Sequence, residues 1–106
     1  MKATNRNPLD EIHEEHRLLA ILRALERWPA YMANALLLGD WLSRLGLAAT
    51  HEVISADLHR LQELDLCTLA TEGELTCISL LERGCEVAEG RVRIEGILRP
   101  GPECPY

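Results

Sequence analysis

The sequence predicts a mainly α-helical domain with a small β-hairpin, arranged as a winged helix-turn-helix. Three segments carry helical periodicity, and only a short turn separates the second segment from the third. Two short β-prone runs around a glycine follow them, as a hairpin requires. The length of 106 residues and the apolar content of 47% fit one core. We therefore expect a winged-helix domain over residues 7–90 and an extended C-terminal arm over residues 91–106.

The first helix is expected to begin at Pro8, after an Asn7 cap, and to run to about Arg27, where Pro29 closes it. Its apolar side chains cover about half of the helix circumference, which is wider than the roughly 100° stripe that one core requires. We expect this surface either to form a homodimer interface or to be covered by Trp28 and the C-terminal segment. The residues of such an interface would be Leu18, Ile21, Leu22 and Leu25.

The second and third helices are expected to form the helix-turn-helix. Asn34 caps the second helix, and Gly46 ends it because glycine readily adopts the left-handed conformation that follows a helix. Thr50 caps the third helix, whose apolar residues repeat at three- and four-residue spacing. The side chains expected to face the core are Leu36, Leu37, Trp41, Leu42 and Leu45 in the second helix and Val53, Ile54, Leu58, Leu61 and Leu64 in the third.

The hairpin that would form the wing consists of CTLAT (67–71) and LTCIS (75–79). Gly73 between these runs can supply the positive φ that a tight turn needs. A further helix is expected from Ser79 or Leu80 to about Glu89, and a short strand is expected at residues 92–94 of the arm.

Two stretches of the chain carry a family resemblance. The segment ISLLERGCEVAEGR (78–91) resembles the passage from hairpin to helix in many winged-helix regulators. The run LLERGCEVAEGRVRIEGILRP (80–100), with EEHRLLAILRAL (14–25) and YMANALLLGDWLSRLG (31–46), resembles a family of small ArsR-like winged-helix proteins of Mu-like phages and prophages. The resemblance covers residues 9–100 and implies the winged-helix fold and a phage or prophage setting. Asp65 stands where such domains often have glycine, so we expect strain or a left-handed conformation there.

Charge argues against easy contact with phosphate backbones or anionic lipid. The net charge is −6, and residues 54–106 hold five basic and ten acidic side chains. Glu72 and Glu74 lie at the predicted tip of the wing, where DNA-binding wings commonly place arginine or lysine.

Two functions remain open on these observations. The first is a DNA-binding transcriptional regulator of phage or prophage origin, which binds double-stranded DNA as a homodimer with its third helix in the major groove. Its candidate DNA-binding residues are Thr50, His51, Ser55, His59, Arg60 and Arg44, with Arg83, Arg91, Arg93 and Arg99 as flanking phosphate contacts. The second is an acidic winged-helix module for protein interaction or dimerisation, which binds another phage or host protein and no DNA.

Other chemistry is weakly indicated. His13 and His16 could offer metal ligands at helical spacing, but exposed first-turn residues are the commoner explanation, and no metal or other cofactor is expected. The four cysteines form no CxxC pair, which favours free thiols in a reducing cytoplasm. The chain carries no nucleophile–base motif and no glycine-rich phosphate loop, so we expect it not to be an enzyme. No apolar run is long enough to span a membrane.

Overall fold

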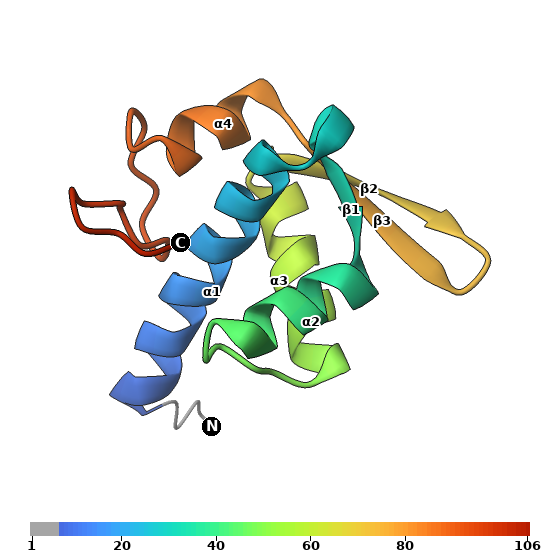
Figure 1. The fold of residues 1–106 in the computed structure, drawn as a ribbon, viewed down its shortest axis with the longest axis horizontal. Coiled ribbons are helices and arrows are strands. Elements are labelled where there is room, and N and C mark those ends of the chain that lie inside the picture. Colours follow the sequence, from blue (N-terminus) through green and yellow to red (C-terminus); the bar gives the residue numbers. More distant parts are fainter. Residues whose placement is uncertain (1–6) are drawn as a thin grey trace.

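The computed structural model describes residues 7–106, which form four α-helices and a three-stranded antiparallel sheet around one core (Figure 1). The elements are α1 (Pro8–Arg27), the 3₁₀ turn η1 (Pro29–Tyr31), β1 (Met32–Asn34), α2 (Ala35–Arg44), α3 (His51–Glu63), β2 (Cys67–Glu72), β3 (Leu75–Leu80) and α4 (Glu82–Ala88). The expected mainly α-helical fold with a hairpin is therefore a mixed α/β fold, because the hairpin belongs to a larger sheet.

The predicted caps hold the starts of the first three helices. Each cap side chain accepts a hydrogen bond from the backbone N–H three residues later, which satisfies a donor that the helix itself leaves unpaired. The three bonds are Asn7 with Asp10 at 2.9 Å, Asn34 with Leu37 at 2.9 Å and Thr50 with Val53 at 3.2 Å. Gly46 follows α2 with a φ of +76°, as expected for a residue that ends a helix.

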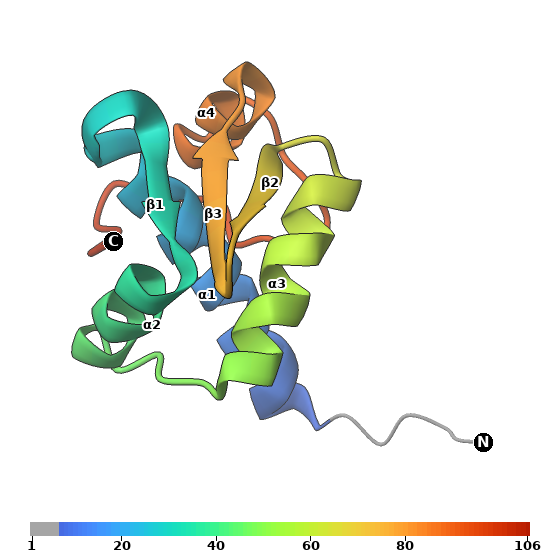
Figure 2. The same ribbon diagram turned by 90° about the vertical axis from the view of Figure 1, so that its right-hand side faces the viewer.

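The sheet has the strand order β1-β3-β2, so β3 lies in its centre (Figure 2). Ile78 of β3 is paired with Ala33 of β1 on one side and with Leu69 of β2 on the other. Strand β1 was not expected from the sequence, since three residues are too few to show alternation and only pairing with β3 makes them a strand. Asp65 takes the left-handed conformation that was one of the two expectations there, with a φ of +62°.

The apolar face of α1 is buried within a single chain. Helix α1 contacts α2, α3, α4 and β3, and the four residues predicted to form a homodimer interface are fully buried. These residues are Leu18, Ile21, Leu22 and Leu25. The prediction that these residues form an exposed homodimer interface is therefore wrong. The alternative expectation, that other segments of the same chain cover them, is the one observed.

The C-terminal arm supplies part of that cover. The backbone N–H of Leu98 donates to the carbonyl of Glu15 at 3.2 Å, and Ile97 beside it is buried in the core. Arg23 of α1 donates to the main-chain oxygen of Tyr106 at 2.8 Å, and the Tyr106 hydroxyl lies 2.7 Å from Nδ1 of His16. The strand expected at residues 92–94 does not form, because the arm is held by these contacts to α1 and pairs with no strand.

Helix α4 begins at Glu82, later than the expected Ser79 or Leu80, because β3 continues through Leu80. Gly84 in this helix lies against the carbonyl oxygen of Leu66, and the Cβ of any other residue at this position would lie 2.3 Å from that oxygen. The close packing of α4 on the corner before β2 therefore depends on a glycine at this position.

Candidate functional site

A buried ion pair sets which side of α3 faces outward. Nε of Arg17 in α1 donates to Oδ2 of Asp57 in α3 at 2.6 Å, and Nη2 donates to Oδ1 at 3.2 Å. Both side chains are less than a tenth exposed, so this buried bidentate ion pair fixes the rotation of α3 about its axis relative to α1. The outward side of the helix is therefore the side away from Asp57.

Carboxylates occupy much of that outward side. Glu52, His59 and Glu63 are exposed, and at 100° per residue they lie within about 40° of one another on the helix. Between residues 51 and 80, Arg60 is the only lysine or arginine, against six aspartates and glutamates. The middle of the face that would meet a DNA groove thus presents two glutamates and one histidine.

The predicted DNA-binding residues do not all lie on one side of α3. His51, Ser55 and His59 lie within about 80° of one another, and Arg60 is the exception. His51 and Arg60 are nine residues apart, which places them on opposite flanks of α3. Nε of Arg60 lies 4.0 Å from Oε2 of Glu14 in α1, so the guanidinium is directed toward a carboxylate of the fold itself. Nδ1 of His59 lies 2.8 Å from the carbonyl oxygen of Ser55, one turn earlier.

The remaining predicted residues differ in their accessibility. Thr50 is exposed, but its hydroxyl accepts the capping hydrogen bond of α3. Ser55 is half-buried. Arg44 is exposed in the last turn of α2, and it therefore lies on a different helix from the other predicted DNA-binding residues. Sequence spacing alone could not reveal these differences, since they depend on how α3 is rotated.

A groove lies between the start of α2, the start of α3 and the hairpin, and we call it the wing groove. Its volume is about 320 Å³. The lining residues are Ala35, Leu36, His51, Glu72, Glu74, Leu75 and Thr76. The apolar side chains come from α2 and the start of β3, and the charged ones come from the hairpin tip. The groove therefore has both apolar and acidic lining residues.

Leu36, which lines this groove, and Leu37, which follows it in the sequence, are exposed, contrary to the sequence prediction. Leu36 is 67% exposed and Leu37 is 48% exposed, because Ala35, Leu38 and Leu42 fill the inward positions of α2. Val53 of α3 was also expected inside and is 38% exposed. Adjoining exposed apolar side chains are typical of surfaces that bind a partner.

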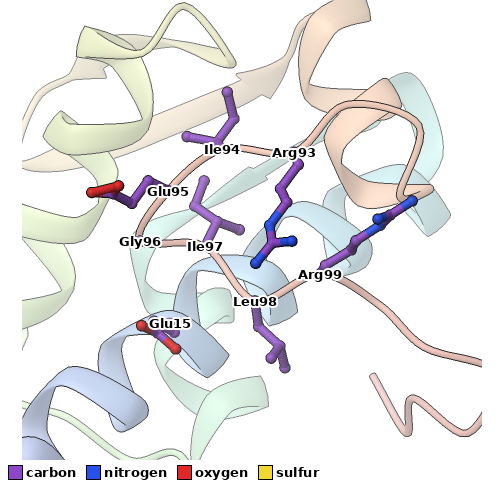
Figure 3. A pocket seen from close by; sticks show the side chains of 8 residues that line it. All are labelled: Glu15, Arg93, Ile94, Glu95, Gly96, Ile97, Leu98 and Arg99. Atoms are coloured by element: carbon purple, nitrogen blue, oxygen red, sulfur yellow. The ribbon is translucent and has the colours of Figure 1, made fainter.

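A second hollow, the arm pocket, lies in the C-terminal arm and has a volume of about 530 Å³ (Figure 3). It is lined by Glu15, Arg93, Ile94, Glu95, Gly96, Ile97, Leu98 and Arg99. The chain turns at Gly96, whose φ is +92°. Arg93 and Arg99 point to one side of the loop, and Glu95 points to the other (Figure 3).

The arm pocket is far from the wing groove. In Figure 1 the hairpin extends to one end of the molecule and the arm forms the opposite end. Arg93 and Arg99 were expected as flanking phosphate contacts for α3. They line the arm pocket, whose residue Gly96 lies beside the Arg60 guanidinium of α3. Arg91, another of those flanking residues, is occupied by an ion pair with Glu89 at 2.6 Å.

Two observations concern metal binding and thiol chemistry in the described residues. Within residues 7–106, no three histidine, cysteine, aspartate or glutamate side chains are grouped so that they could hold a metal ion. Burial, with a smaller effect from the neighbouring Cys85 thiol, raises the pKa of Cys67 to about 12, which makes this thiol unreactive at neutral pH. No helix in the described part of the chain is long and apolar enough to cross a membrane.

Comparison with known proteins gives one informative relative. The chain is 34% identical over 94 residues to the uncharacterized protein gp26 of Escherichia phage Mu, and the match covers 89% of this chain and 97% of that protein. No protein-family model and no solved structure matches the chain.

Proposed function

This chain belongs to the family of gp26 of Escherichia phage Mu, and from that premise we propose that it is a winged-helix protein of phage or prophage origin that binds another protein. The contact surface in this proposal is the wing groove together with the outward side of α3. Duplex DNA is not its ligand in this proposal.

The order of the elements supports the winged-helix assignment. A helix-turn-helix, formed by α2 and α3, is followed directly by the β2–β3 hairpin. The short strand β1 between α1 and α2 pairs with β3, which fixes the hairpin beside α3 (Figure 2). Helix α4 and the arm are then additions that cover α1.

The charge of the α3 and hairpin surface is the observation that carries the proposal. Four glutamates of this surface are exposed: Glu52, Glu63, Glu72 and Glu74. Affinity for DNA depends on lysine and arginine side chains that neutralise phosphates and release counterions. The one arginine available, Arg60, lies beside Glu14. A surface of this composition repels phosphate and suits a partner with basic groups.

Two exposed leucines of α2 also favour a protein partner. Complete burial of a leucine side chain stabilises a fold or a complex by about 1.5–3 kcal/mol. Leu36 and Leu37 are largely exposed in the isolated chain, so a partner that buries them would gain much of this free energy. Phosphate groups cannot bury these side chains, whereas apolar residues of a protein can. The combination of apolar and acidic lining residues therefore favours a protein that carries both apolar and basic side chains.

DNA binding is the second candidate, in the form of a transcriptional regulator. The position of Thr50 and His51 favours it, since both are exposed at the N-terminal end of α3, where helix-turn-helix proteins contact base edges. Arg44 could add a phosphate contact from α2. This candidate requires Glu52 and the hairpin tip to turn away from the phosphates.

A DNA titration separates the two candidates. We expect no saturable binding of fluorescent random-sequence duplex DNA at about 50 mM salt with protein up to about 100 μM, the weak end of non-specific affinities. The variant Glu72→Lys/Glu74→Lys should gain salt-dependent binding and so shows that the assay can detect it. Saturable binding by the unaltered chain, weakened by salt and by Arg60→Ala, would establish the DNA candidate in place of ours.

Site-specific photo-crosslinking tests the contact surface directly. A photoreactive amino acid at Leu36, in cells that carry the phage, should give an adduct that protease removes and nuclease does not. The same amino acid at the exposed Arg83 of α4 serves as the matched control and should give no such adduct. The Leu36 adduct should disappear in the Glu72→Lys/Glu74→Lys background. An adduct that nuclease removes would contradict the proposal.

A further inference from the structure

Two arginines of the arm pocket lack a partner in the described part of the chain. Arg93 and Arg99 are exposed, and neither forms an ion pair or a hydrogen bond with a side chain or main-chain oxygen among residues 7–106. Five other arginines contact oxygen atoms of the fold: Arg17, Arg23, Arg27, Arg60 and Arg91. Arg44 and Arg83 also form no ion pair or side-chain hydrogen bond within residues 7–106, but they do not line this pocket. Since a guanidinium group binds carboxylates with matched geometry, the pocket suits a ligand with two carboxylates.

The acidic residues of the pocket do not neutralise these arginines. Glu15 and Glu95 line the hollow, but neither forms an ion pair with Arg93 or Arg99 in the described structure. Glu95 points away from both arginines (Figure 3). The arginine side of the loop is therefore open to an external ligand.

The tip of the hairpin has the complementary composition. Glu72, Gly73 and Glu74 are all exposed, and neither glutamate forms an ion pair with another described residue. The φ of Gly73 is +63°, which gives a tight turn with one carboxylate on each side. Leu75 follows at the start of β3 and is half-buried, so an apolar side chain lies directly behind the acidic tip.

These two features lie at opposite ends of the molecule. The hairpin and the arm occupy the two ends of the longest axis in Figure 1, and in Figure 2 the hairpin faces the viewer while the arm lies behind α1. A tip of one copy can therefore meet the arm of another copy without the two bodies overlapping. Such a contact joins two different surfaces, so it repeats head to tail and forms a ring or an open chain.

We propose that the arm pocket binds the hairpin tip of a second copy, with Glu72 and Glu74 paired to Arg93 and Arg99. This proposal rests on the proposed function, because it identifies the protein partner of the hairpin as another copy of this chain. The pocket volume of about 530 Å³ lies within the roughly 300–1,000 Å³ of typical ligand sites. Ile94 and Leu98 in its lining are half-buried and can contact Leu75 of the incoming hairpin.

The contact should depend strongly on salt. Its charged groups are exposed in the free chain, and the Debye length falls from about 30 Å at 0.01 M salt to about 10 Å at 0.1 M. We therefore expect sedimentation velocity to show concentration-dependent association at low salt and less association as salt is added.

Charge-swapped variants of the full chain test the pairing. The variant Glu72→Arg/Glu74→Arg has a basic tip and a basic pocket, and the variant Arg93→Glu/Arg99→Glu has an acidic tip and an acidic pocket. Each should remain a monomer under conditions in which the unaltered chain associates. An equimolar mixture should associate again, because every tip then meets a pocket of opposite charge. A chain with all four substitutions should associate by itself.

A control separates the specific pairing from the effect of net charge. Glu82→Arg/Glu103→Arg changes the net charge as Glu72→Arg/Glu74→Arg does, but at exposed positions outside both surfaces, and should associate like the unaltered chain. Circular dichroism confirms that each variant folds.

Two results would overturn the proposal: an unaltered chain that stays monomeric at low salt, or folded variants that do not associate when mixed. The DNA titration described above is independent of both results. If the mixed variants associate and the unaltered chain also binds DNA, the proposed function is wrong and this contact stands. If the mixed variants do not associate and the unaltered chain binds no DNA, this contact is wrong and the proposed function stands.

Discussion

The buried pair between Arg17 and Asp57 gives the sharpest prediction about stability. The Arg17 and Asp57 side chains are 8% and 5% exposed, so the values measured for surface pairs do not apply. Removing one partner of a buried pair leaves an uncompensated charge and costs about 3–5 kcal/mol. We expect Arg17→Met to lower the free energy of unfolding by that amount, because methionine fills much of the space of the arginine side chain but carries no positive charge to pair with Asp57.

That loss is a large part of the stability of such a chain, which is about 5–15 kcal/mol for most native proteins. With an m value of about 1–3 kcal/mol/M for urea, it moves the unfolding midpoint by roughly 1–5 M. The partly buried Trp28 and Trp41 provide a fluorescence signal for the measurement. The double variant Arg17→Met/Asp57→Leu should recover most or all of the loss, since apolar replacement of both partners is often neutral or stabilising.

An exposed ion pair provides the control. Arg91 and Glu89 form a 2.6 Å pair whose side chains are 63% and 43% exposed, so Arg91→Met should leave the urea midpoint unchanged within error. A midpoint for Arg17→Met equal to that of the unaltered chain would refute the reasoning. A double variant no more stable than Arg17→Met would refute it as well, because the cost would then not come from the Asp57 carboxylate that has lost Arg17.

Two further changes follow from local geometry and titration. Gly84→Ala should lower the free energy of unfolding by about 1–3 kcal/mol, because the new Cβ meets the Leu66 carbonyl oxygen at 2.3 Å, whereas Gly101→Ala meets nothing within 4 Å and should be neutral by the same urea assay. Burial and a hydrogen bond to Glu89 raise the pKa of Glu26, so folding favours its protonated form. Its contribution is therefore full below the ordinary glutamate pKa and is lost as pH rises through the raised value. The urea midpoint of Glu26→Gln, relative to that of the unaltered chain, should therefore rise from about pH 4 to about pH 7. The same difference between the two midpoints at both pH values would contradict this.

The local signals in the sequence predicted most of the fold. Asn7, Asn34 and Thr50 form the expected caps because capping depends on a side chain and a backbone N–H three residues away. The left-handed Asp65 was one of the two outcomes expected at the corner before the hairpin. Strand β1 was missed because its stability comes from β3, more than 40 residues later in the chain.

The site was only partly predictable, and the reason is again distance along the chain. The acidic tip at Glu72 and Glu74 is visible in the sequence, since a glycine between two β-prone runs identifies the turn. The pairing of Arg60 with Glu14 is not visible, because it depends on the rotation of α3 against α1. The arm pocket left one usable signal, a glycine at position 96 midway between Arg93 and Arg99, which indicates a tight loop with both guanidinium groups nearby.

The cover that the arm provides for α1 has a consequence for how the chain folds during synthesis. The contacts between α1 and the arm join residues up to 90 positions apart, such as His16 and Tyr106. Helix α1 is translated before the arm, so its leucines are fully enclosed only after the residues of the arm have been added. Contacts of such long range slow folding and prolong the exposure of apolar surface. Chains truncated before the arm should accordingly aggregate or be degraded more readily than the unaltered chain.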